Sequence, residues 1–194
     1  MTIAGSIAAA TGIAITQKNA GDMTISGGIT GTDGDITIDR KNAGSLAISG
    51  DTTAENGKVT IATINEVLNE DADMTISGAV SANGDVTISQ ENAGNAAISG
   101  AISAATNVAI TQENAGDMEI SSSITSADGD ITVERNNAGS LAISGDTTAE
   151  NGKVSISSIN DTLNADANME ITGAVNARDE VEIIQKNADD IAIS

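Results

Sequence analysis

A repeat of the sequence at an offset of 95 residues constrains this chain more than any other feature. The stretch GSLAISGDTTAENGKVTI at residues 44–61 returns at residues 139–156 with one change, from Thr60 to Ser155. Such self-similarity is typical of solenoids, in which each repeat packs against its neighbours along one axis. We therefore expect a solenoid made of two copies of one long unit.

Each unit divides further into coils of similar length. Most coils, cut after successive Asn-Ala steps, have 21 to 23 residues, and two have 29. The coils are 1–20, 21–43, 44–72, 73–93, 94–115, 116–138, 139–167 and 168–188, and residues 189–194 open a ninth. The domain prediction is a single segment, 1–194, with internal duplication 1–95 / 96–194. We expect it to be a fragment of a longer array, because the repeat runs to both ends.

Within a coil, apolar residues alternate with small polar ones in two short segments, as in MTIS at residues 23–26 and ITI at residues 36–38. This period of two predicts strands with their apolar side inward. A lone apolar residue between the two segments marks a third, shorter strand; examples are Ile7, Ile29, Val80, Ile102, Ile124 and Val175. The predicted fold is all-β: a right-handed parallel β-helix of about eight coils, roughly 40 Å long at a strand spacing of about 4.8 Å.

The expected core follows from the same pattern. The inward positions are Ile25, Ile36, Ile38, Ile48, Val59, Ile61, Ile76, Ile88, Ile98, Ile120 and Ile143. Thr52 and Thr147 take the third inward position in the two long coils. Four methionines at the first inward position of alternate coils are expected to fill the core: Met23, Met74, Met118 and Met169.

The composition fits a narrow interior and excludes several functions. The chain has no Phe, Tyr, Trp, Cys, His or Pro, so it has neither a disulfide framework nor the commonest metal ligands. Its net charge of −20 argues against nucleic acid and anionic membranes as partners. No stretch is long and apolar enough for a membrane span. Residues 1–16 superficially resemble a signal peptide but lack basic residues and align with residues 96–111, so we interpret them as a coil.

Two kinds of turn recur between the strands. Asp-Gly or Asn-Gly pairs, such as Asp33-Gly34 and Asn56-Gly57, precede the second strand, and such pairs accept positive φ. After that strand comes an Asn, followed by Ala, at one coil position. We predict that these residues form a structural ladder in which each side-chain amide bonds the next coil, and that Asn42, Asn92, Asn114 and Asn137 are semi-buried and stack. The ladder residues are Asn19, Asn42, Asn92, Asn114, Asn137 and Asn187.

The two long coils carry extra segments at residues 62–72 and 157–167. Apolar residues in these segments have roughly helical spacing. We interpret each segment as a protruding loop with one helical turn, on the same edge and about four coils apart. The expected contact residues are Asn65, Glu66, Asn69, Asn160, Asp161 and Asn164.

Neither catalysis nor a metal site is strongly indicated by the acidic residues. Acids recur at offset positions, as Asp22 does at Asp117 and Asp35 at Asp130, whereas catalytic carboxylates are normally unique. We therefore expect no enzyme and no catalytic residue. Asp33, Asp35, Asp71 and Asp73 lie near turns, where calcium could find oxygen ligands, but no calcium-binding nonapeptide is present. The prediction is no cofactor and no defined metal site, apart from weak calcium binding by the acidic surface.

A row of threonines is the remaining candidate surface. Thr37, Thr60, Thr87 and Thr132 point outward on successive second strands, and a flat threonine array could order water as in ice-binding solenoids. The same row contains Ala14, Ala109, Ser155 and Glu182. Because threonine is favoured on exposed strands in general, we prefer a structural role.

The pattern G-D-[IV]-T-[IV]…N-A-G-x-[ML]-x-I-S-G, at residues 34–50 and 129–145, resembles the repeats of filamentous-haemagglutinin-like adhesins. The resemblance covers nearly the whole chain and implies a right-handed parallel β-helix from a bacterial surface or secreted protein.

Taken together, these features predict a structural rod or fibre segment of an extracellular bacterial adhesin or surface filament. It would act as a spacer and would extend by end-to-end self-association or by continuation of a longer chain. A binding module for glycan, calcium or ice on one repeated face is the alternative, with a host or cell-surface glycan as candidate partner. A polysaccharide-active enzyme is a distant third hypothesis.

Overall fold

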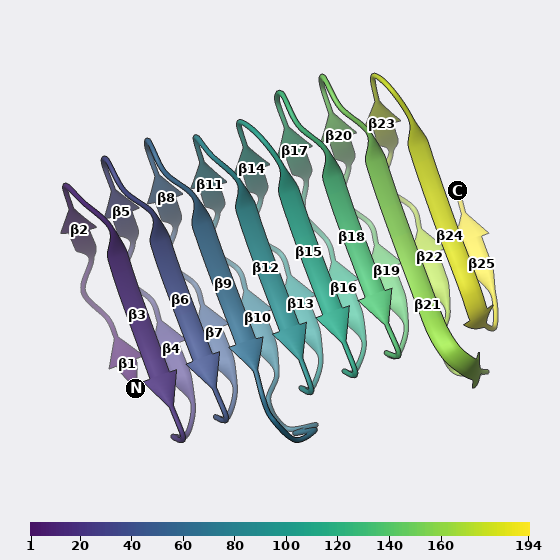
Figure 1. The fold of residues 1–194 in the computed structure, drawn as a ribbon, viewed down its shortest axis with the longest axis horizontal. Helices are drawn as coiled ribbons and strands as arrows, with labels where there is room; N and C mark the ends of the chain where they lie inside the picture. Colours follow the sequence, from purple (N-terminus) through teal and green to yellow (C-terminus); the bar gives the residue numbers. More distant parts are fainter.

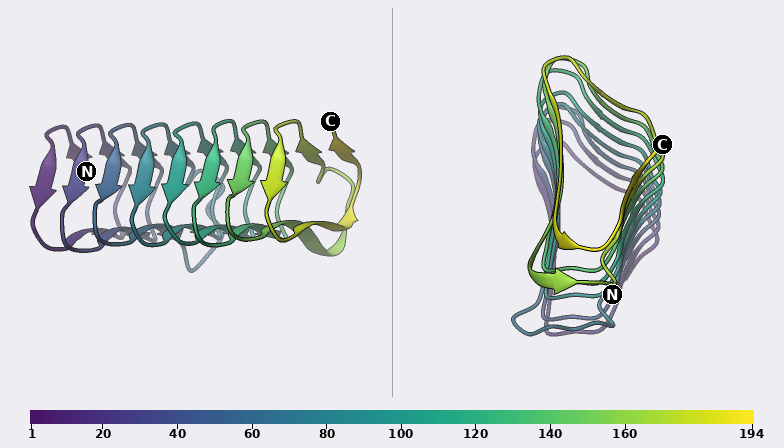
Figure 2. Two further views of the ribbon diagram at one scale, coloured as in Figure 1. Left: turned by 90° about the horizontal axis from the view of Figure 1, so that it is seen from above. Right: turned by 90° about the vertical axis from the view of Figure 1, so that its right-hand side faces the viewer.

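The computed structural model describes all of residues 1–194 and shows a parallel β-solenoid of about eight turns with no helix. Three strands in each turn build three sheets, which run side by side along the molecule (Figures 1 and 2). Sheet A consists of β1 (Thr2–Ile3), β4 (Met23–Ile25), β7 (Leu46–Ile48), β10 (Met74–Ile76), β13 (Ala96–Ile98), β16 (Met118–Ile120), β19 (Leu141–Ile143), β22 (Met169–Ile171) and β25 (Ile191–Ile193).

The other two sheets have eight strands each. Sheet B consists of β2 (Ile7–Ala9), β5 (Ile29–Gly31), β8 (Thr52–Ala54), β11 (Val80–Ala82), β14 (Ile102–Ala104), β17 (Ile124–Ser126), β20 (Thr147–Ala149) and β23 (Val175–Ala177). Sheet C consists of β3 (Ile13–Lys18), β6 (Ile36–Lys41), β9 (Val59–Ile64), β12 (Val86–Glu91), β15 (Val108–Glu113), β18 (Ile131–Asn136), β21 (Val154–Asn164) and β24 (Val181–Ala188). Each coil thus contributes one strand to each of the three sheets. This arrangement confirms the predicted parallel architecture.

Every neighbouring pair of strands is parallel, and equivalent residues of successive coils lie opposite one another. Residues of one coil position therefore form rows along the axis. In sheet A, one such row passes from Ile76 to Ile98 to Ile120. Because parallel strands at about 4.8 Å spacing bury the apolar face of each coil on the next, the rows form one continuous core.

The core is a single cluster of Ile, Val, Leu, Met and Ala. All eleven aliphatic residues predicted to point inward are buried, and so are the four methionines. Thr52 and Thr147 are fully buried in β8 and β20, as predicted, and their hydroxyl oxygens have no hydrogen-bond partner. The interior is narrow, and aliphatic side chains fill most of it, which is why the chain needs no aromatic residue.

The predicted helical turn in the long coils is wrong. After β9 the segment forms bends and a turn closed by a bond from Ala72 N to Asn69 O. The equivalent segment of the second long coil extends strand β21 as far as Asn164. The spacing of the apolar residues misled the prediction because Val67, Leu68 and Leu163 do not pack on a shared face and are exposed instead.

The predicted positive φ in the Asp-Gly and Asn-Gly turns is also wrong, since no glycine has a positive φ. Glycine is needed there for close approach between coils. A Cβ atom on Gly57 would collide with the backbone of Gly34 in the preceding coil, and one on Gly152 would collide with Gly129.

No helix in the structure has the length and apolar character of a membrane crossing.

Candidate functional site

The six ladder residues share one backbone conformation. Each has a positive φ, between 47° and 52°, and they are the only residues of the chain that do. Asparagine tolerates this left-handed region better than most residues do. The Asn therefore turns the chain from sheet C toward sheet A, a role for which the sequence analysis had credited the glycines of other turns.

The ladder side chains do not bond one another. No hydrogen bond joins two of the six, and four of them bond a long coil instead. At the first long coil, Asn42 Oδ1 accepts from Glu66 N and Asn92 Nδ2 donates to Asn65 O, both at 2.8 Å. At the second, Asn137 exchanges hydrogen bonds with Asp161, and Asn187 Nδ2 donates to Asn160 O at 2.7 Å. Asn19 and Asn114 adjoin no long coil. These bonds therefore attach the long coils to their neighbours.

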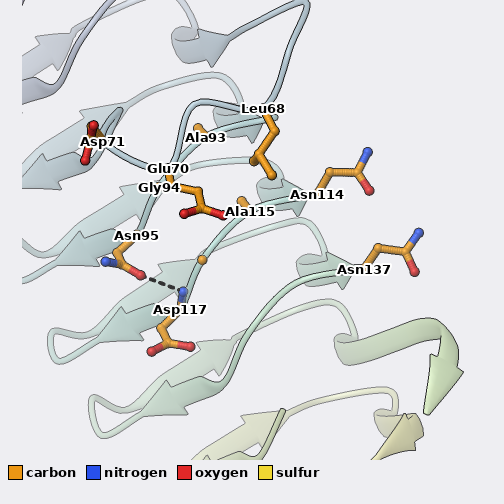
Figure 3. A pocket seen from close by; sticks show the side chains of 11 residues that line it. Leu68, Glu70, Asp71, Ala93, Gly94, Asn95, Asn114, Ala115, Asp117 and Asn137 are labelled. Atoms are coloured by element: carbon orange, nitrogen blue, oxygen red, sulfur yellow. Dashed lines mark hydrogen bonds between the residues drawn. The ribbon is translucent and has the colours of Figure 1, made fainter. Parts of the chain in front are cut away.

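Burial also differs along the ladder. Asn42 and Asn92 are half-buried, but Asn114 and Asn137 are exposed, so the prediction that these two are semi-buried is wrong. Figure 3 shows both side chains pointing away from the neighbouring coils. The left-handed backbone directs the side chain outward, and only beside the first long coil are the ladder residues half-buried.

Asn65 and Asn160 have the ladder position in the two long coils, with an ordinary backbone conformation and a buried side chain. Asn65 Oδ1 accepts from Ala43 N and its Nδ2 donates to Asn92 O, both at 3.1 Å. Asn160 Oδ1 accepts from Ala138 N at 3.1 Å in the same way. Both were predicted as contact residues; burial makes them anchors instead, which fix the base of each loop to the coils on either side.

The rest of each loop is presented at the surface. Of the other predicted contact residues, Glu66 and Asp161 are exposed, and Asn69 and Asn164 are half-buried. The sequence analysis missed the apolar tips: Val67 is 77% exposed and Leu163 is 73% exposed. Anchored bases and exposed apolar tips make the loops preorganised protrusions on one edge of the solenoid.

A hollow of about 670 Å³ lies beside the first loop, over the turns of the next coils (Figure 3). Leu68 and Glu70 form one wall, and the exposed amides of Asn114 and Asn137 border the other side. Asn95 Oδ1 accepts from Asp117 N at 2.8 Å in its floor. The hollow is polar and acidic and holds no cluster of reactive groups.

A second ladder lies inside sheet C and was not predicted. One inward position of successive coils carries Gln17, Arg40, Thr63, Gln90, Gln112, Arg135, Ser158 and Gln185. We call these eight residues the polar column. Arg135 Nε donates to Gln112 Oε1 at 2.9 Å, and Gln112 Nε2 donates to Gln90 Oε1 at 2.9 Å. The column thus contains a directional chain of hydrogen bonds between coils.

The two arginines of the column are almost fully buried, and each is followed in the next coil by a short hydroxyl residue, Thr63 or Ser158. A small neighbour leaves room for the long arginine side chain. Burial lowers the pKa of Arg135 to about 10, against an opposing effect of Asp117. Burial likewise lowers the pKa of Arg40, whose three guanidinium nitrogens have no partner. The column therefore costs stability at Arg40.

The aspartates near the turns cap backbone amides of the next coil. Asp22 Oδ1 accepts from Ser45 N at 2.8 Å, and Asp117 does the same for Ser140 at 2.6 Å. Corresponding pairs join Asp35 to Lys58, Asp51 to Ala79, Asp73 to Asn95, Asp130 to Lys153 and Asp146 to Ala174. No group of three or more acidic side chains is placed to hold a metal ion. The repeated acids thus have a structural use, which explains their recurrence at the offset of 95 residues.

Asp85 gives this capping a testable pH dependence. Hydrogen bonds from the Thr106 hydroxyl and Asn107 N–H hold the pKa of Asp85 well below its usual 3.8. Because the folded-state pKa is lowered, the carboxylate stabilises the fold above pH 3.8 and loses this contribution as the pH falls below it. We expect Asp85→Asn to lower the free energy of unfolding by about 1 kcal/mol at pH 7 and by less near pH 2, where part of the contribution is lost.

Urea unfolding at both pH values measures this effect. Thr106→Val is the matched variant, because it removes the hydroxyl donor and leaves the carboxylate. In a double-mutant cycle, Asp85→Asn should cost less in the Thr106→Val background. An equal cost at pH 2 and pH 7 would show that Asp85 does not act through its charge.

Hydroxyl side chains cover two outer faces. The predicted row on sheet C, with Thr37, Thr60, Thr87 and Thr132, is half-buried and interrupted as the sequence showed. An uninterrupted row of hydroxyl residues lies on sheet B. Six consecutive coils carry Thr30, Thr53, Ser81, Ser103, Thr125 and Thr148. Ser81 Oγ donates to Thr53 Oγ1 at 3.2 Å. This uncharged row was missed because the third strand was located from a single apolar residue.

Comparisons of the chain with family models, with curated proteins and with solved structures found no match.

Proposed function

We propose that this chain is a structural rod or fibre segment of an extracellular bacterial adhesin or surface filament. It acts as a spacer of fixed length. It also extends end to end, through polymerisation or through covalent continuation in a longer chain. The solenoid is right-handed in this proposal, and residues 1–194 are one segment made of two copies of a four-coil unit, 1–95 and 96–194.

One observation carries the proposal: the strands stack in parallel along the entire chain, and the apolar rows reach the last coil. There Val181, Ile191 and Ile193 are 44 to 58% exposed, although their row mates inside the solenoid are buried. Unpaired strand edges with exposed apolar residues are templates for further pairing. Such an end is suited to continuation of the rod, and the anchored loops are suited to lateral contacts with a partner.

A repeated-face binding module is the second candidate, and the hydroxyl row of sheet B favours it. Thr30, Thr53 and the four residues that continue their row carry no charge on a chain of net charge −20. A flat hydroxyl array at the coil spacing of about 4.8 Å could contact a glycan or ordered water. Calcium has less support, since the turn carboxylates are used as caps.

Light scattering and electron microscopy of the 194-residue chain over a range of salt concentrations test the proposal. The charge of −20 opposes association, and salt screens it beyond about 10 Å at 0.1 M. We expect rods of constant width that lengthen as salt rises. Particles that remain single coil stacks at every salt concentration would exclude polymerisation, and a clean positive on a glycan array, abolished by Thr53→Glu and Thr125→Glu, would favour the second candidate.

A further inference from the structure

The polar column is incomplete at its C-terminal end. Gln185 Oε1 is buried and has no hydrogen-bond partner. The equivalent atom 95 residues earlier, Gln90 Oε1, accepts from Gln112 Nε2 in the next coil at 2.9 Å. Gln112 is in turn the counterpart of Gln17, the first member of the column. The donor that Gln185 lacks is therefore present at the other end of the same chain.

Charge is also complementary between the two ends. Residues 1–20 are the only coil without an acidic residue, and they carry Lys18. Residues 168–194 carry six acids, Glu170, Asp179, Glu180, Glu182, Asp189 and Asp190, against two bases, Arg178 and Lys186. A first coil stacked on a last coil would thus meet less repulsion between acidic residues than two interior acidic coils do.

Resting on the proposed end-to-end assembly, we propose that copies of this chain join head to tail in the register of the internal β12–β15 junction. In that register β3 of the next copy pairs with β24, and β2 pairs with β23. The paired residues follow from the internal pairs Val86↔Val108 and Ser89↔Thr111, which become Val181 with Ile13 and Ile184 with Thr16. Gln17 of the next copy then donates to Gln185 and completes the column.

The joint shares one strand position. Sheet A has nine strands, whereas sheets B and C have eight. By the offset of the repeat, β25 already fills the place that β1 of the next copy would take, since Ile193 corresponds to Ile98 and Ile3. One of these two strands must leave, so each copy adds eight coils to the rod and not nine. The axial repeat is then roughly 38 Å at about 4.8 Å per coil.

The same register places Lys18 of the next copy opposite Lys186, as Glu91 lies opposite Glu113 inside the chain. Like charges opposite each other are unfavourable in a sheet, and both lysines are exposed. This pair opposes the joint at low salt and does so less as salt screens it. The expected salt dependence of assembly therefore has a local source as well as a global one.

Cysteine cross-linking tests the register, because the natural chain has no cysteine. Thr16→Cys and Ile184→Cys are prepared as separate variants at exposed positions, mixed and oxidised at a salt concentration that favours assembly. Directly opposed Cα atoms about 4.8 Å apart lie within disulfide range. We expect a covalent heterodimer. The matched control mixes Thr16→Cys with Glu182→Cys, two residues out of register and beyond disulfide range, and should give at least tenfold less.

Three outcomes are distinguishable when the parent chain is followed by light scattering in parallel. Growth of the parent with selective Thr16→Cys–Ile184→Cys cross-linking supports the inference. Growth with no cross-link, or with as much from the control pair, overturns the register and leaves end-to-end assembly standing. No growth and no cross-link overturn both. Circular dichroism melting of each variant establishes that it folds as the parent does.

Discussion

Replacing Ile98 by alanine is expected to lower the free energy of unfolding by about 3 kcal/mol, since buried Ile→Ala changes cost roughly 2–5 kcal/mol. Ile98 is 1% exposed in β13, between Ile76 and Ile120 of the same row. Neighbouring coils are held apart at a fixed distance by their backbone bonds, so the space left by the side chain cannot collapse. Urea unfolding followed by circular dichroism measures the loss.

Ile193→Ala is the matched control, because Ile193 is the counterpart of Ile98 in the last strand and is 58% exposed. It should change the stability of the single chain by less than about 1 kcal/mol. A loss as large as that of Ile98→Ala would mean that the last strand is covered in solution.

Asn65→Ala is expected to cost about 2 kcal/mol, because it leaves a buried backbone N–H, that of Ala43, without its partner at about 1–3 kcal/mol. The Asn92 carbonyl loses one donor, Asn65 Nδ2, and keeps the Asn69 N–H at 3.0 Å. The loss should be accompanied by faster hydrogen exchange at Ala43 and in the loop that follows Asn65. Chemical unfolding and exchange measured by NMR test both effects.

Two variants separate the anchor from the loop. Asn65→Asp keeps the acceptor for Ala43 and loses only the donor, so its cost should be intermediate. Asn69→Ala removes a longer bond, 3.3 Å to Ala43 O, from a half-buried position and should cost about 1 kcal/mol. Equal losses for Asn65→Ala and Asn69→Ala would refute the distinction between a buried anchor and a surface loop.

The parallel coils could be predicted from sequence because alternation leaves few choices. In MTIS at residues 23–26 the apolar side chains can face inward only if the segment is a strand. The repeat offset then requires successive strands to lie in register. The helical turn was mispredicted because Val67 and Leu68 were assumed to pack, whereas the loop is held by Asn65 and presents them to solvent.

The interior polar residues could also have been found from the sequence. Arg40 shares the parity of Ile36 and Ile38 on one strand, as Asn65 shares that of Val59 and Ile61 on another. Extending the alternation past the apolar residues places both inward. The charge of Arg40 and the polarity of Asn65 argued for positions on the surface. Only the register between coils shows that a short residue, Thr63, makes room for Arg40. Which side chains of the column bond each other, as Gln112 and Gln90 do, could not be predicted from the sequence.

Cryo-electron microscopy of the assembled chain tests most directly the claim that it is a rod that continues end to end. We expect filaments one solenoid wide, with strands stacked without interruption at about 4.8 Å and a repeat of roughly 38 Å for each chain of eight coils. Isolated particles at every salt concentration, or filaments built by side-by-side contact of the loops with gaps between solenoid ends, would contradict it.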